Sequence, residues 1–148
     1  MKRISIFTAA TAACLIAFVM MSSFMMIPSA SASKALTLNR SEPIHIFGTI
    51  TSADGTTYYG PVTLSGAINA SGTFVMPSQL IGMALHCTFV LKLPNGNITI
   101  RMNCNMVTFN GRWKILEGTG AYQNLKGEGS LVMPNDNDEI LDGIIHGM

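Results

Sequence analysis

The stretch that decides the fold is Gly111-Arg-Trp-Lys-Ile-Leu-Glu-Gly-Thr-Gly-Ala-Tyr-Gln-Asn-Leu-Lys-Gly-Glu-Gly129. It predicts a strand over residues 112–117, a corner pinned by two glycines, one helical turn over residues 121–126, and a second strand that runs on to Met133. Glycines occur where a backbone bends sharply or where strands approach too closely for a Cβ atom. The stretch therefore predicts two strands joined through a tight corner.

The rest of the chain consists of short apolar or alternating runs separated by Gly, Pro and Asn. No window has a helical period, and strands are expected in these runs. The expected strands cover residues 44–51, a strand pair within 56–69 interrupted at Gly60-Pro61, then 73–76, 84–93, 98–109 and 139–146, and residues 77–82 are expected to be a connection. Short, regularly spaced strands with turn residues between them predict an all-β sandwich or barrel.

Two Asn-Gly pairs, Asn95-Gly96 and Asn110-Gly111, are the strongest hairpin signals. The second turn would place Met106 opposite Ile115 and Thr108 opposite Trp113. Pro94 leaves open a three-residue turn with a compensating bulge, because proline lacks the N–H that closes a tight pair. The first turn would pair a uniformly apolar face, namely Leu93 with Ile98, Leu91 with Ile100, Phe89 with Met102, and Cys87 with Cys104.

The first 32 residues are predicted to be a cleaved signal peptide. Lys2 and Arg3 are followed by an uncharged, largely apolar run that ends at Ala30-Ser-Ala32, a small-x-small cleavage site. An uncleaved membrane anchor is the alternative. Residues 33–43 are expected to be a flexible lead-in, and residues 44–148 a single domain. The protein is thus expected to be secreted or periplasmic, and to meet a membrane only during export.

Composition excludes several function classes. Without the leader the chain is close to neutral and slightly acidic, with no basic stripe, so nucleic acid is not an expected partner. Its three histidines are scattered, and no metal-binding or cofactor motif is present, so no metal or cofactor is expected. An acidic group near the C-terminus lacks the spacing of a calcium loop and is interpreted as a solvated loop; its members are Asp136, Asp138, Glu139 and Asp142.

Two cysteines remain after leader removal, Cys87 and Cys104. An even pair in an exported protein favours a disulfide, and the Asn95-Gly96 register sets the two residues directly opposite each other. The alternative is two buried free thiols that pack as small apolar groups.

The segment Gly118-Thr-Gly-Ala-Tyr-Gln-Asn-Leu-Lys-Gly-Glu-Gly129, after Trp113, resembles the Gly-Thr-Gly-x-aromatic signature of the allene oxide cyclase-like and dirigent-like β-barrels. It looks most like their small secreted bacterial members. The resemblance implies an antiparallel, calycin-like barrel of about eight strands around an apolar cavity. In the plant families that cavity binds an unstable lipid epoxide or guides radical coupling. None of their catalytic residues falls within the matched motif, so the resemblance supports the fold more than an activity.

The leading hypothesis is a secreted barrel that binds a small apolar molecule in its interior. Its candidate ligand-binding residues are Phe89, Leu91, Ile100, Met102, Trp113 and Ile115. The alternative for these residues is a core filled by side chains, as small barrels often have.

Two other functions stay open. An isomerase or cyclase would need a buried acid, and the second hairpin places Glu117 across from Cys104 on the inward face as a candidate general acid or base. Glu117 could equally turn into solvent if its strand ends at Leu116. The third hypothesis is a cell-surface interaction protein that uses Val90, Val107 and Phe109 on the outer face. The sequence leaves open whether the protein is an enzyme.

Overall fold

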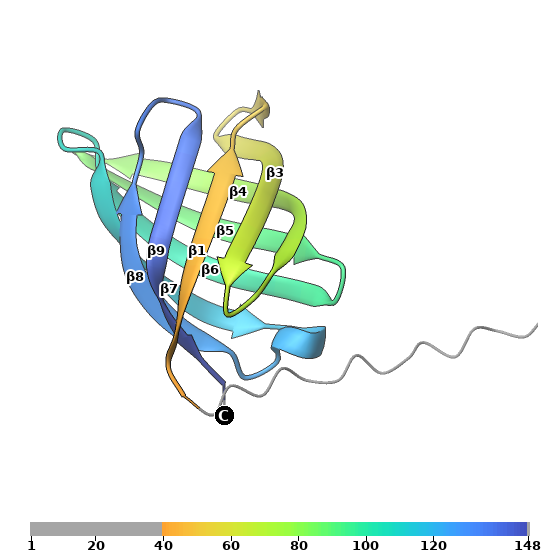
Figure 1. The fold of residues 1–148 in the computed structure, drawn as a ribbon. Helices are drawn as coiled ribbons and strands as arrows, with labels where there is room; N and C mark the ends of the chain where they lie inside the picture. Colours follow the sequence, from red (N-terminus) through yellow and green to blue (C-terminus); the bar gives the residue numbers. More distant parts are fainter. Residues whose placement is uncertain (1–39, 148) are drawn as a thin grey trace, which may run out of the picture. The chain divides into compact units, whose positions relative to one another are not determined.

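The computed structural model describes residues 40–147, and these form a closed antiparallel β-barrel (Figure 1). The predicted signal peptide and most of the lead-in lie outside the described residues. Nine strands follow one another along the chain: β1 (Glu42–Thr49), β2 (Ser52–Asp54), β3 (Thr57–Gly66), β4 (Ala70–Ile81), β5 (Ala84–Leu93), β6 (Gly96–Asn105), β7 (Asn110–Gly118), β8 (Lys126–Val132) and β9 (Asp138–His146).

Eight of these strands make the ring, because β1 pairs with β9 on one side and with β3 on the other. The remaining strand, β2, pairs with β3 as a short extension. A single 3₁₀ turn, η1 (Gly120–Tyr122), is the one helical segment in residues 40–147. Within these residues, no helix has the length and apolar character needed to cross a membrane. The predicted all-β fold and antiparallel barrel are confirmed.

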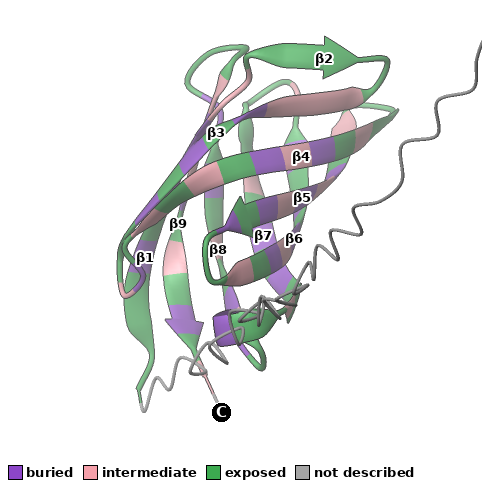
Figure 2. Ribbon diagram, turned by 90° about the vertical axis from the view of Figure 1, so that its right-hand side faces the viewer, coloured by how far each residue is buried: buried purple, intermediate pink, exposed green. Residues whose placement is uncertain are grey.

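Side chains alternate between the barrel interior and its surface, as period-two strands require. Figure 2 shows this alternation as bands of buried and exposed residues along the strands. Large apolar side chains fill the interior. The largest of those that are almost completely buried are Trp113, Phe74, Phe89, Ile46, Met76, Leu91, Ile98, Ile100, Met102, Leu125, Leu131 and Leu141. Two of these rings, Phe74 and Phe89, contact each other with centroids 4.7 Å apart.

The stretch from Gly111 to Gly129 forms the predicted strand, corner and strand, in β7, η1 and β8. The corner is fastened to the β5–β6 turn: the Thr119 N–H donates to the Asn97 carbonyl (2.9 Å), and the Ala121 N–H donates to the Asn95 carbonyl (2.8 Å). A Cβ atom on Gly96 would lie 2.1 Å from the Thr119 carbonyl oxygen, so only glycine fits there. This contact explains why the start of β6, where it meets the corner, requires glycine.

The predicted register of the first hairpin is wrong. Leu93 pairs with Gly96, so the two-residue loop is Pro94-Asn95, and Leu91 lies opposite Ile98. Every apolar pair is thereby displaced by two positions, although the inward faces are unchanged. Proline suits the first turn position because its φ is already fixed near the required value.

The predicted register of the second hairpin is also wrong. A four-residue loop, residues 106–109, joins β6 to β7, and Asn105 pairs with Asn110. Asn105 makes this turn, because its side-chain oxygen accepts hydrogen bonds from the N–H groups of Val107 (2.8 Å) and Thr108 (3.3 Å). As a result Trp113 lies opposite Met102 rather than Thr108.

Two strand predictions need correction as well. Residues 57–66 form one continuous strand rather than a pair interrupted at Gly60-Pro61. A Cβ on Gly60 would lie 1.8 Å from the Thr49 carbonyl oxygen, so this glycine allows β1 to pass close by instead of ending the strand. The fourth strand extends through Pro77 to Ile81, where a connection was expected.

Candidate functional site

Among the described residues, Glu139 is the one polar or charged residue that the barrel buries, with 1% of its surface exposed. It is the second residue of β9 and lies beside Gly48 of β1. Leu141 and Ile145, on the same face of β9, are completely buried. Because alternate side chains share one face, the register that buries these two residues also turns Glu139 inward.

The Glu139 carboxyl is incompletely hydrogen-bonded: its Oε2 atom has no partner within residues 40–147. Burial disfavours the charged form and raises the pKa of Glu139 from 4.5 to about 7. A buried polar atom without a partner is rare and costs about 1–3 kcal/mol. Glu139 is therefore a candidate functional group that can gain or lose a proton near neutral pH.

Two buried thiols lie within electrostatic range of this carboxyl. Burial, then the charge of Glu139, then Cys104 raise the pKa of Cys87 to about 12. The pKa of Cys104 is also raised, first by burial and then by Glu139. Both groups therefore remain protonated, and this region of the interior presents one carboxyl and two thiols among apolar side chains.

The predicted disulfide is not confirmed, and the expected pairing is wrong. Cys87 lies opposite Met102, and Cys104 lies opposite Leu85, so the cysteines are diagonal neighbours. Diagonal positions on adjacent strands are typically about 7–8 Å apart, beyond the usual Cα separation of a disulfide. Both cysteines are free and buried.

We expect both thiols to be slow to react in the folded protein. Burial and the raised pKa values suppress the thiolate, which is the reactive form. Iodoacetamide at pH 8, without reductant, should leave native protein that lacks residues 1–32, and with them Cys14, unmodified and should add two labels after denaturation in urea. Intact mass spectrometry counts the labels. No label on the denatured, unreduced protein would mean that a disulfide had formed.

The structure does not bring Glu117 to the interior. This side chain is exposed and lies opposite Thr99, whose hydroxyl donates to Glu117 Oε1 at 3.4 Å. The inward placement across from Cys104 is therefore wrong, and the proposed catalytic role loses its structural reason. The changed register moves Glu117 away from Cys104, and the irregularity between Thr99 and Ile100 turns its side chain from the inner to the outer face.

The six residues predicted to line the interior are all buried there: Phe89, Leu91, Ile100, Met102, Trp113 and Ile115. Their contact with a ligand stays a prediction. Of the residues suggested for an outer interaction surface, Val107 and Phe109 are exposed, but they belong to the β6–β7 loop instead of a strand. Val90 is half-buried.

Sequence reasoning missed Glu139 because it grouped the acidic residues by proximity. Asp138 accepts a hydrogen bond from the Thr49 hydroxyl (2.9 Å), and Asp142 contacts His45 at 2.6 Å, both near the surface. The alternation of Glu139 with Leu141 and Ile145 was the signal that could have separated the inward acid from its neighbours. No three residues of the metal-ligating types gather to form a metal site in residues 40–147.

Comparison with known proteins adds little about activity. No protein-family model matches the chain, and no curated protein matches it significantly. Among solved structures, a pterocarpan synthase dirigent protein matches with 14% sequence identity and a TM-score of 0.44, over 76% of this chain and 98% of that chain. A match at this level carries no argument about function, and the barrel rests on the strand pairing described above.

Proposed function

We propose that this barrel binds a small, largely apolar molecule in its interior and that the Glu139 carboxyl is the polar anchor. The supporting observation is the Oε2 atom of Glu139, which is buried without a hydrogen-bond partner in the described part of the chain. A hydroxyl or amine on the ligand would donate the missing hydrogen bond. The apolar remainder would contact inward side chains such as Phe89 and Leu91, in the usual pattern of small-molecule sites.

Binding requires some interior side chains to move. The four cavities described on the barrel are lined chiefly by outward-facing residues and lie at its surface. Met102, directly across from Cys87, is buried and belongs to the residue type that adapts its shape most easily. We infer that a ligand would enter by displacing such flexible side chains near Glu139.

The proposal also includes export from the cytoplasm, which rests on the leader-like residues 1–32. The proposed interior ligand has a second support in the sequence. The Gly118–Gly129 motif resembles that of allene oxide cyclase-like and dirigent-like barrels, and this resemblance implies an interior cavity that holds a small molecule.

The test is fluorescence titration with 1-aminoanthracene, a neutral aromatic amine that can donate to a carboxyl oxygen. We expect saturable binding to the parent protein and about tenfold weaker binding to Glu139→Gln at pH 8, because a hydrogen bond to a charged group contributes about 1.5–3 kcal/mol. Glu117→Gln is the matched control, since it makes the same change at an exposed position. Its affinity should equal that of the parent.

Equal loss of affinity in both variants, or no saturable binding by the parent, would contradict the proposal. If the probe binds as expected, native mass spectrometry of protein purified from its own source should identify the natural ligand, as an added mass that is retained by the parent and lost from Glu139→Gln.

A second candidate function is acid–base catalysis in the same interior. The observation that favours it is the pKa of Glu139, which burial places at about 7 and thus close to the value that suits proton transfer at neutral pH. An isomerase or cyclase would use Glu139 in the role first considered for Glu117. A turnover that is lost in Glu139→Gln with ligand affinity retained would favour this candidate over simple binding.

A further inference from the structure

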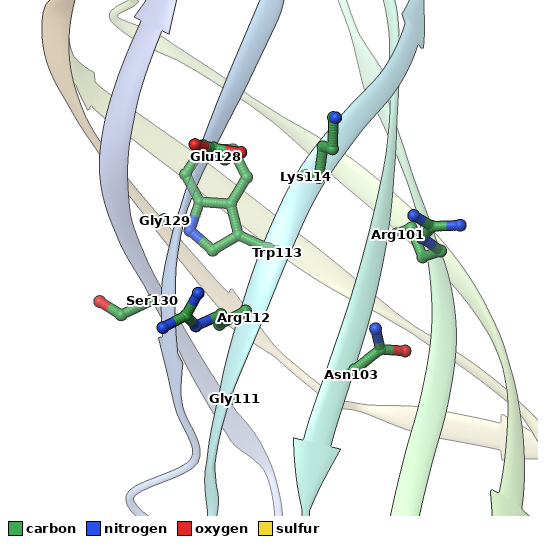
Figure 3. Close-up of a pocket in the computed structure, with 9 residues that line it drawn as sticks. All are labelled: Arg101, Asn103, Gly111, Arg112, Trp113, Lys114, Glu128, Gly129 and Ser130. Carbon is green, nitrogen blue, oxygen red and sulfur yellow. The ribbon is translucent and has the colours of Figure 1, made fainter.

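The outer surface of the barrel carries a groove of about 470 Å³ across strands β6, β7 and β8. Figure 3 shows the side chains around it, which project from neighbouring strands. Two glycines, Gly111 and Gly129, line the groove, and the buried indole of Trp113 lies next to Gly129. Both glycines occupy inward-facing positions, opposite buried residues of the neighbouring strands, so at these two points the outer surface of the groove is formed by strand backbone.

Three cations surround this groove, and one acid accompanies them. Arg101 and Lys114 are direct cross-strand partners, and Arg112 lies on the same outer face two residues before Lys114. Glu128 is the only acidic residue lining the groove. Lys114 thus has a like charge, Arg101, directly opposite on one side and an opposite charge, Glu128, directly opposite on the other, so the repulsion from Arg101 is only partly offset.

These cations are not neutralised by ion pairs. Within residues 40–147 the one close contact between groups of opposite charge type joins His45 to Asp142, which lies opposite Ser130 on the next strand and does not involve the three cations. Arg101, Arg112 and Lys114 are all exposed, and each keeps its charged group available to solvent or ligand. Neutral donors stand beside them, because the amide of Asn103 and the hydroxyl of Ser130 also line the groove.

We propose that this groove binds an oxyanion, phosphate or sulfate, either free or as an ester on a small organic molecule. Two guanidinium groups can each donate two parallel hydrogen bonds to such an anion, while the ammonium group of Lys114 contributes a point charge. The bound anion would relieve the repulsion between Arg101 and Lys114. This site is separate from the interior site at Glu139, and the two proposals stand or fall independently.

Titration of ¹⁵N-labelled protein followed by NMR tests the proposal at constant ionic strength. The probes are sodium phosphate, sodium sulfate and glucose 6-phosphate, with sodium chloride as the ionic control. We expect saturable shifts of the backbone amides of Asn103, Arg112 and Gly129 with the oxyanions and none that saturate with chloride. Tighter binding of glucose 6-phosphate than of phosphate would identify an ester as the ligand class, and equal binding would identify the free anion.

Variants separate specific binding from general charge attraction. Arg101→Gln and Lys114→Gln should each weaken oxyanion binding about fivefold or more, and Arg101→Lys should restore only part of it because lysine lacks the planar fork. Lys92→Gln, an equal loss of charge at an exposed position outside the groove, should leave binding unchanged. Equal weakening by Lys92→Gln, or shifts that match those of chloride, would overturn the proposal. The spectra report at once whether each variant is folded.

Discussion

Replacing Trp113 with alanine is expected to lower the free energy of unfolding by about 3–5 kcal/mol. The indole is 2% exposed, and its Nε1–H donates to the Asp142 carbonyl at 3.2 Å. It lies against two glycines: a Cβ atom on Gly129 would be 2.7 Å from Nε1, and one on Gly143 would be 2.5 Å from Cζ2. Neither glycine has a side chain to fill the space that alanine would leave, so the cavity would persist.

Urea denaturation followed by circular dichroism measures this loss. Trp113→Phe serves as the comparison, because it keeps an aromatic ring on the two glycines and gives up the hydrogen bond and part of the contact area. We expect its loss to be clearly smaller than that of Trp113→Ala. An alanine variant within about 1 kcal/mol of the parent would show that the indole is not packed in this way.

Replacing Glu139 with glutamine is expected to stabilise the protein by about 3 kcal/mol at pH 8 and by much less at pH 4. The carboxyl of the unfolded chain ionises near 4.5, whereas burial raises the folded-state pKa to about 7. Folding is therefore favoured by this group below pH 4.5, and that contribution is lost as the pH rises through about 7. A neutral amide at the same position has no charge to desolvate, so the variant escapes this loss.

The measurement is the difference in unfolding free energy between variant and parent, from urea melts at several pH values from 4 to 8. Groups that titrate alike in both proteins cancel in this difference. Glu117→Gln, at an exposed position, should show no comparable rise between pH 4.5 and pH 7. A flat difference for Glu139→Gln as well would mean that the carboxyl is hydrated in the folded protein.

The inward faces of the strands could be predicted from the sequence, but their register could not. The strands at residues 84–93 and after Gly96 alternate so strictly that their buried residues are recognisable by period alone. Register depends on turn geometry, and both Asn-Gly pairs proved misleading. Gly96 is required by contact with Thr119, a residue distant in sequence, which no local pattern reveals. Asn105 makes the second turn through local hydrogen bonds from its side chain, a signal that the neighbouring Asn-Gly pair concealed.

The candidate site was missed for a related reason. Glu139 closely follows a polar loop, and as a charged residue it resembles that loop more than the apolar strand to which it belongs. Its inward direction depends on Leu141 and Ile145, which are deeply buried and fix the face of the whole strand. Closure of the barrel was likewise beyond pattern analysis, because the residues allowed a sandwich as readily as a barrel, and only the family resemblance favoured the barrel.

The seam between β1 and β9 has a consequence for how quickly the chain can fold. His45 and Asp142, which meet across this seam, are 97 positions apart in sequence. Pairing between such distant segments must overcome the entropy of closing a long loop, so folding is expected to be slow compared with that of helical proteins of similar size. Until the seam closes, both strands present unpaired edges that can pair with other chains. Closure therefore competes with aggregation, and refolding should succeed best at low protein concentration.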